Sequence, residues 1–142
     1  MSLKAIAARI YASLEARRTA RWKRRPLATQ EAVFKELLRS ASNTTFGKDH
    51  QFSSINTHED FCARVPIRDY EDLKPYINRV LQGEEDILWP GKPIYFAKTS
   101  GTTSGLKYIP ISAISMKEQV AASRNAILNY IHETGKSAFV DG

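Results

Sequence analysis

The hydrophobic pattern of the chain changes at Trp89, and this change limits the folds that it can adopt. Before Trp89, apolar residues recur at three- and four-residue spacing, which is typical of amphipathic helices. After Trp89, short apolar runs at residues 94–97 and 108–111 are bounded by glycine, proline and hydroxyl residues, which is typical of strands. The order predicts an α/β fold, in which N-terminal helices precede the first strands of a sheet that the chain leaves incomplete.

Two long helices are expected in the first part of the chain. The first covers residues 3–24, and Pro26 ends it. One face of this helix carries an apolar stripe, which we expect to dock on a globular domain: Leu3, Ile6, Ala7, Ile10 and Leu14. The second helix begins with Thr29 as its N-cap and buries one apolar face: Val33, Phe34, Leu37, Leu38 and Ala41. A loop rich in Ser, Asn and Thr follows at residues 42–47.

Two further helices are expected before Trp89, and each has a recognisable start. Each start has the spacing of a capping box, in which two side chains satisfy each other's backbone N–H groups. The two pairs are Thr57 with Asp60 and Asp69 with Asp72. Pro75 lies inside the second of these helices and removes a backbone donor there. We therefore expect a kink or a restart at Pro75.

After Trp89 the expected order is strand, loop, strand, helix and strand. The helix begins at Ser112 or Ser115 and ends at Gly135. The three strands are at residues 94–97, 108–111 and 137–140.

Positive charge is concentrated at the N-terminal end of the chain. The formal net charge is +6, yet residues 1–25 hold eight basic residues against Glu15 alone, and residues 26–142 are nearly neutral. We therefore divide the chain into a basic amphipathic helix (1–25), a helical part (26–88) and a strand-containing part (89–142). Together these are expected to be the N-terminal part of a larger domain, with the C-terminal domain absent.

Composition argues against several classes of protein. Cys62 is the only cysteine among 142 residues, which excludes an internal disulfide and suits a reducing cytoplasm, where we expect the protein. The three histidines are scattered and give no zinc-site spacing, so we predict no metal-ligating residues. No apolar run approaches the ~20 residues that a membrane-spanning helix needs.

The segment from Thr99 to Lys107 is the part of the sequence that points to chemistry. It contains five hydroxyl residues and two glycines, and it ends in a lysine. Backbone N–H groups at glycines, short hydroxyls and a mobile ammonium are the donors that a polyphosphate requires. The segment is not a Walker A loop, because three residues separate Gly101 from Gly105 and Leu106 follows. Taken alone, it leaves open a hydroxyl-rich hairpin without a ligand.

The wider sequence resembles the auxin-responsive acyl-acid amido synthetase family, within the acyl-adenylate-forming superfamily. The superfamily loop runs Ser-Gly-Thr-Thr/Ser-Gly-x-Pro-Lys, and residues 100–103 and Lys107 match it, whereas Ser104 and Leu106 replace the usual glycine and proline. The resemblance is strong over about residues 43–112 and includes blocks at residues 46–50, 57–61 and 65–77. Because the plant members' loop carries one more residue before its lysine, the resemblance suggests a bacterial-type relative.

Members of this family join a carboxylic acid to an amino acid through an acyl-adenylate, using ATP and normally Mg²⁺. The resemblance implies that Lys107 is catalytic and that seven residues bind the ATP phosphates: Thr99, Ser100, Gly101, Thr102, Thr103, Ser104 and Gly105. It also implies that Arg124 contacts the acyl substrate, for which a solvated surface arginine is the alternative. The adenine pocket and the Mg²⁺ ligand lie in later sequence in this family. We therefore expect the 142-residue chain alone to be an inactive fragment of a ligase.

Two other interpretations of residues 1–25 stay open. The basic helix is suited to a non-enzymatic binding module on nucleic acid or an anionic membrane. It also has the composition of an organellar targeting peptide. No nucleic-acid reader motif or aromatic interleaving accompanies the charge. We therefore expect a small-molecule carboxylic acid and an amino acid as partners, and neither nucleic acid nor membrane.

Overall fold

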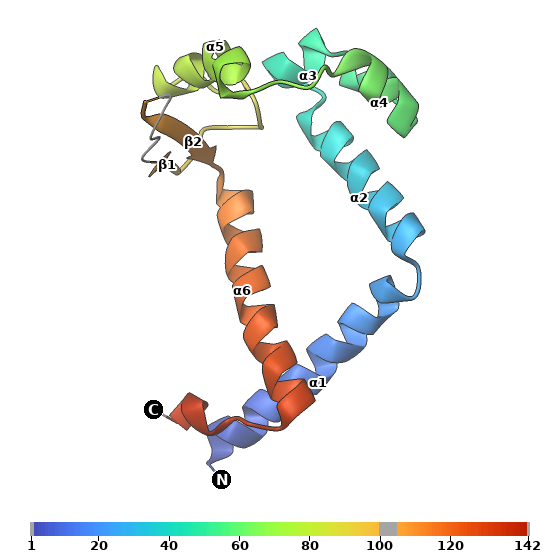
Figure 1. Cartoon of the computed structure of the whole chain (residues 1–142), viewed down its shortest axis with the longest axis vertical. Helices are drawn as coiled ribbons and strands as arrows, with labels where there is room; N and C mark the ends of the chain where they lie inside the picture. Colours follow the sequence, from blue (N-terminus) through green and yellow to red (C-terminus); the bar gives the residue numbers. More distant parts are fainter. Residues whose placement is uncertain (1, 100–104, 142) are drawn as a thin grey trace. The chain divides into compact units, whose positions relative to one another are not determined.

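The computed structural model describes residues 2–99 and 105–141. Its elements, in chain order, are α1 (Leu3–Lys23), α2 (Pro26–Ala41), α3 (Thr45–Asp49), η1 (Phe52–Ser54), α4 (His58–Arg64), α5 (Tyr70–Leu81), β1 (Tyr95–Thr99), β2 (Lys107–Ile111), α6 (Ala113–Thr134) and η2 (Ala138–Asp141), where η marks a 3-10 helix (Figure 1). Within the described residues, six α-helices accompany one two-stranded antiparallel sheet. The expected α/β class, with helices before the strands, is confirmed.

The chain forms two compact units, and each is described by itself. Unit 1 consists of Met1–Gln30 and Met116–Gly142, and it contains α1, most of α6 and η2. Unit 2 is Glu31–Ser115, and it contains most of α2 and the elements from α3 to β2.

In unit 1, α1 packs through small residues rather than through its larger apolar side chains. Ala12 is 1% exposed and forms the core cluster with Leu128 and Ile131 of α6, against which Ala8 and Val140 also pack. The expected docking stripe is wrong, because Leu3, Ile6, Ile10 and Leu14 are all exposed. Alanines on the opposite face allow other elements to approach the backbone of α1 closely, which bulkier side chains do not.

Two helix boundaries differ from the expected ones. The second helix, α2, begins at Pro26, whose missing N–H is tolerated in a first turn. Thr29 is inside α2 and not its cap, and its hydroxyl donates a hydrogen bond of 2.8 Å to the carbonyl of Arg25. The expected loop at residues 42–47 instead starts α3, because the Thr44 side chain caps that helix by accepting the Gly47 N–H at 3.0 Å. A side chain at Gly47 would overlap the carbonyl of Ala41.

The capping boxes at the starts of α4 and α5 are confirmed. Thr57 and Asp60 satisfy each other's backbone N–H groups at the start of α4, and Asp69 and Asp72 do the same at α5. No restart occurs at Pro75, because α5 is one helix throughout. Proline removes a single ladder hydrogen bond there, and the capped helix keeps the others.

The hairpin of β1 and β2 confirms two of the three strands expected after Trp89. Its antiparallel register sets Tyr95 opposite Ile111 and Thr99 opposite Lys107. Residues 100–106 therefore connect the two strands at the Thr99–Lys107 end. Within unit 2, α5 packs on β2 (Figure 1).

The helix after the hairpin has the expected start and end. Ser112 caps α6, because its Oγ accepts the N–H of Ser115 at 3.1 Å. Gly135 has a φ of +67° just beyond the last helical residue, Thr134, as glycines that end helices commonly do.

Residues 138–141 form η2, so the strand expected at residues 137–140 is wrong. A strand needs a neighbour for its backbone groups, and within the described ranges β1 and β2 pair only with each other. The segment instead closes a turn, in which the N–H of Val140 donates to the carbonyl of Ser137 at 3.1 Å, and η2 packs along α1.

Candidate functional site

The candidate phosphate site lies at the connected end of the β1–β2 hairpin, in unit 2. Thr99 ends β1 and Lys107 begins β2, and the register sets these two residues opposite each other. Five of the expected phosphate-binding residues lie outside the described part of the chain: Ser100, Gly101, Thr102, Thr103 and Ser104. The structure thus places the first and the last residue of the expected phosphate loop at one end of one hairpin.

Gly105 has a backbone conformation that favours glycine. Its φ is +77°, in the left-handed region that residues with a side chain rarely adopt. A Cβ built on Gly105 would meet no atom within 4 Å. The requirement for glycine at this position is therefore conformational and does not come from a crowded neighbour.

Lys107 is a half-buried cation held against an aromatic ring. Its Nζ lies 5.4 Å from the centroid of the Tyr70 ring, a distance at which a cation–π interaction is favourable. None of the ion pairs in the described residues involves Lys107. Because no carboxylate of this part of the chain neutralises it, the ammonium is suited to binding an anion.

Tyr70, the first residue of α5, connects that helix to the hairpin. Its hydroxyl accepts the N–H of Tyr108 at 2.8 Å and donates to the carbonyl of Tyr108 at 3.5 Å. Sequence analysis assigned Tyr70 no role, because its partners lie almost forty positions further along the chain. The only signal was its place inside the block at residues 65–77 that carries part of the resemblance, directly after the capping Asp69.

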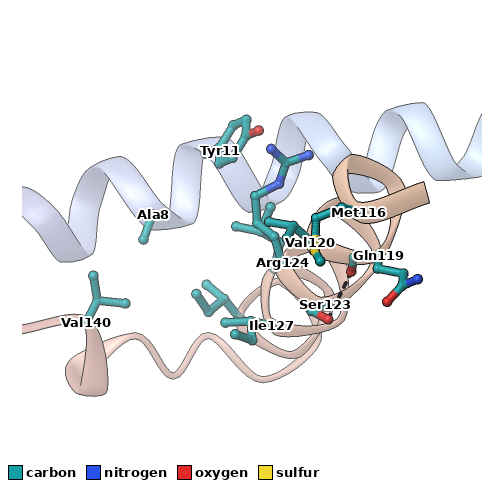
Figure 2. Close-up of a pocket in the computed structure, with 11 residues that line it drawn as sticks. Ala8, Tyr11, Met116, Gln119, Val120, Ser123, Arg124, Ile127 and Val140 are labelled. Carbon is teal, nitrogen blue, oxygen red and sulfur yellow. Dashed lines mark hydrogen bonds between the residues drawn. The ribbon is translucent and has the colours of Figure 1, made fainter. Parts of the chain in front are cut away.

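Arg124, the expected acyl contact, belongs to unit 1, whereas the hairpin belongs to unit 2. It is on α6, exposed, and its guanidinium carbon lies 5.7 Å from the centroid of the Tyr11 ring of α1. Figure 2 shows Arg124 extending from α6 toward Tyr11. The arginine is therefore held on an aromatic face rather than by a carboxylate.

Arg124 borders an open, largely apolar groove of about 660 Å³ between α1 and α6 (Figure 2). The apolar part of its lining comes from both helices and from η2, and it includes Ala8, Met116, Val120, Ile127 and Val140. A groove of this kind, with one cation at its side, has the chemistry that suits an apolar molecule bearing a carboxylate.

Two further groups in unit 2 are held by hydrogen bonds that sequence analysis did not foresee. His50 is buried, and its Nδ1 lies 2.8 Å from the carbonyl of Phe46 and its Nε2 lies 3.1 Å from an Arg68 nitrogen. Tyr76 donates its hydroxyl to Asp49 at 2.8 Å, and burial, together with this bond, raises the pKa of Tyr76. These contacts hold α3 against the segment around α5 that carries Tyr70.

Within residues 2–99 and 105–141, no three His, Cys, Asp or Glu side chains are grouped so as to hold a metal ion. No helix in the same ranges combines the length and the apolar character needed to cross a membrane.

Comparison of the sequence with known proteins identifies the family to which the chain belongs. Residues 16–139 match the model of the GH3 family N-terminal domain. The indole-3-acetic acid-amido synthetase GH3.2 of Arabidopsis thaliana is 36% identical over 83 residues, which are 58% of this chain and 15% of that protein. The putative indole-3-acetic acid-amido synthetase GH3.10 of Oryza sativa subsp. japonica is 33% identical over 120 residues, which are 79% of this chain and 25% of that protein.

These matches show which family the chain belongs to and how much of the relatives' length it covers. The chain spans a quarter or less of the length of these two relatives. The family model covers nearly all of the chain, including the hairpin, Lys107 and Arg124. The chain belongs to the GH3 family, whose N-terminal domain it matches.

Proposed function

We propose that the chain supplies the phosphate-binding hairpin of an ATP-dependent acyl-acid amido synthetase. Two relatives are named amido synthetases of indole-3-acetic acid, which supports an enzyme that forms an amide from a carboxylic acid. The observation that carries the proposal is the position of Lys107, opposite Thr99 and without a carboxylate partner in the described residues.

The proposed reaction has two steps. A carboxylate oxygen of the acid attacks the α-phosphorus of ATP, the bond to the β-phosphate oxygen breaks, and pyrophosphate leaves. The amino group of an amino acid then attacks the acyl carbon, the bond to AMP breaks, and the nitrogen loses a proton. Negative charge builds on phosphate oxygens in both steps, so positioned donors lower the barriers.

In this proposal Lys107 neutralises charge on the phosphates, and Gly105 allows the backbone to turn toward them. The hydroxyls from Thr99 to Ser104 donate to phosphate oxygens. Mg²⁺ is the normal companion of ATP in such reactions, but no acidic cluster in the described residues fits it. No residue of the described part of the chain is therefore proposed as a Mg²⁺ ligand.

The relatives are at least four times as long as the part that matches this chain. We infer that the 142 residues alone bind phosphate but do not complete the reaction. Purified chain supplied with ATP, Mg²⁺, indole-3-acetate and labelled pyrophosphate is expected to show no acid-dependent exchange of label into ATP. Robust exchange would contradict this inference.

Binding of inorganic tripolyphosphate, measured by calorimetry, tests the role of the hairpin. The Lys107→Met variant is expected to bind about tenfold more weakly or worse, since a charge-assisted hydrogen bond contributes about 1.5–3 kcal/mol. Lys92→Met is the matched control, because Lys92 precedes β1 in the same unit and pairs with Glu85 at 3.3 Å. Equal loss in both variants would indicate non-specific attraction and overturn the proposal.

We also propose that the groove beside Arg124 receives the acyl acid. The apolar lining matches an aromatic or aliphatic body, and the guanidinium matches a carboxylate. Indole-3-acetate added to labelled chain is expected to shift the amide signals of Val120 and Ile127. Arg124→Gln should weaken these shifts, whereas the uncharged analogue indole-3-acetamide should bind both proteins alike. Identical responses of both proteins to indole-3-acetate would remove Arg124 from this role.

A further inference from the structure

We propose that Tyr70 is the positioning residue of the phosphate site, because one phenol holds both the ammonium of Lys107 and the strand from which Lys107 projects. The inference rests on the proposed function, since it concerns how the hairpin binds phosphate. It assigns a role to a residue of α5, which is not adjacent to the loop in the sequence.

The hydroxyl of Tyr70 restrains the backbone of β2. It accepts the Tyr108 N–H at 2.8 Å and lies within 3.5 Å of the carbonyl of the same residue, to which it donates. Tyr108 directly follows Lys107, so this contact fixes the strand one residue from the lysine. A half-buried backbone N–H that no strand pairs is stabilised by such a partner, and a side chain supplies it here.

The outer edge of β2 is where this contact occurs. Tyr108 and Pro110 are two residues apart, so an antiparallel ladder places their backbone nitrogens on the same edge. Proline has no N–H and suits an edge that no third strand continues. Tyr70 therefore satisfies, on that edge, the N–H next to the lysine, while the opposite edge pairs with β1.

The ring of Tyr70 restrains the side chain of Lys107. The Nζ lies 5.4 Å from the ring centroid, so the ammonium is attracted to the ring face without being neutralised. A carboxylate in this place would compete with a phosphate, whereas an aromatic ring leaves the charge intact. The lysine is thus oriented before an anion arrives, which reduces the entropy lost on binding.

Tyr70 is itself held in place by the start of α5. The preceding residue, Asp69, accepts the N–H of Asp72 at 3.0 Å, and Asp72 accepts the N–H of Asp69 at 3.3 Å. This capping box fixes the backbone at the first helical turn, and Tyr70 is the first residue of that turn. The side chain of Tyr70 therefore connects the capped first turn of α5 to the ammonium of Lys107.

Two substitutions separate the contributions of hydroxyl and ring. Tyr70→Phe keeps the ring and loses the bonds to Tyr108, and Tyr70→Leu loses both. Tyr76→Phe is the matched control, because it removes a hydroxyl of the same helix that bonds to Asp49 instead of the hairpin. Circular dichroism first verifies that each variant folds.

The first readout is the proton chemical shift of the Lys107 ε-methylene group. The ring current of Tyr70 is expected to shift this signal upfield in wild type and Tyr70→Phe, and the shift should vanish in Tyr70→Leu. The second readout is the affinity for inorganic tripolyphosphate. It is expected to fall about threefold in Tyr70→Phe and about tenfold in Tyr70→Leu, and to stay unchanged in Tyr76→Phe.

A double-mutant cycle distinguishes positioning from general support of the fold. In a Lys107→Met background, Tyr70→Leu is expected to cause little further loss, since Tyr70 acts through the lysine. If Tyr70→Leu lowered the affinity for tripolyphosphate equally in both backgrounds, the inference would be overturned and the hairpin's role would stay intact. Equal affinity of wild type and Tyr70→Leu would have the same consequence. Failure of the wild-type chain to bind tripolyphosphate would overturn both the inference and the proposed function.

Discussion

Thr99 and Lys107 face each other across the last pair of the β1–β2 ladder, so both ends of the connecting segment are held by the same two strands. A segment with anchored ends loses less conformational entropy on ligand binding than a free one. The hairpin therefore acts as the rigid base of the candidate site, and changes that strain its turn are expected to alter binding.

The first prediction concerns Gly105, whose φ is +77°. Gly105→Ala is expected to destabilise the hairpin by about 1 kcal/mol, because an alanine in this backbone region is strained. Gly105→Asn should cost less, since asparagine adopts the left-handed region more readily. Thermal unfolding of the three proteins measures the difference. Equal stability of wild type and Gly105→Ala would contradict the conformational account.

The second prediction concerns the contact between α1 and α6. Ala12 is 1% exposed against Leu128 and Ile131, so Ala12→Leu is expected to cost about 1–3 kcal/mol through overpacking. Ile10→Leu, on the exposed face of the same helix, should change the unfolding free energy very little. Urea unfolding compares the two variants. If Ile10→Leu were the more destabilising, the apolar stripe would be the packed face after all.

The third prediction concerns the pH dependence of the α4 cap. Hydrogen bonds from the backbone N–H groups of Asn56 and Thr57 lower the pKa of Asp60 below its usual value. A carboxyl whose pKa is lower in the folded than in the unfolded state stabilises the fold above its unfolded pKa. That contribution is lost as the pH falls through the folded value.

Titration of the Asp60 carboxyl carbon by NMR measures this pKa directly. The midpoint is expected below that of an unstructured aspartate, and the amide signal of Thr57 should move with it. Asp60→Asn should abolish the coupled movement of the Thr57 signal. A normal midpoint for Asp60 would show that the capping bonds do not persist in solution.

Local signals allowed part of this fold to be predicted from the sequence. The capping boxes at Thr57 and Asp69 involve residues only three positions apart, so spacing alone indicated them. The two strands of the hairpin were expected from short apolar runs bounded by turn residues. These elements depend on neighbours in the chain.

Features that depend on distant partners were not predictable in this way. Apolar periodicity favours the bulkiest face of a helix, so it indicated the wrong face of α1, which packs through Ala5 and Ala12 instead. The same reasoning expected a strand at residues 137–140, where η2 forms without a pairing partner. In the candidate site, the sequence indicated Thr99 and Lys107 but not the contact between Tyr70 and Tyr108, since nothing in local spacing relates α5 to β2.

The most direct test of the account is to map tripolyphosphate binding on the isotopically labelled chain by NMR. The largest amide shifts are expected on residues 99 and 105–108 at the end of the hairpin, and they should saturate with a single affinity and disappear in Lys107→Met. Shifts concentrated instead on the basic residues of α1, or a response that Lys107→Met leaves unchanged, would contradict it.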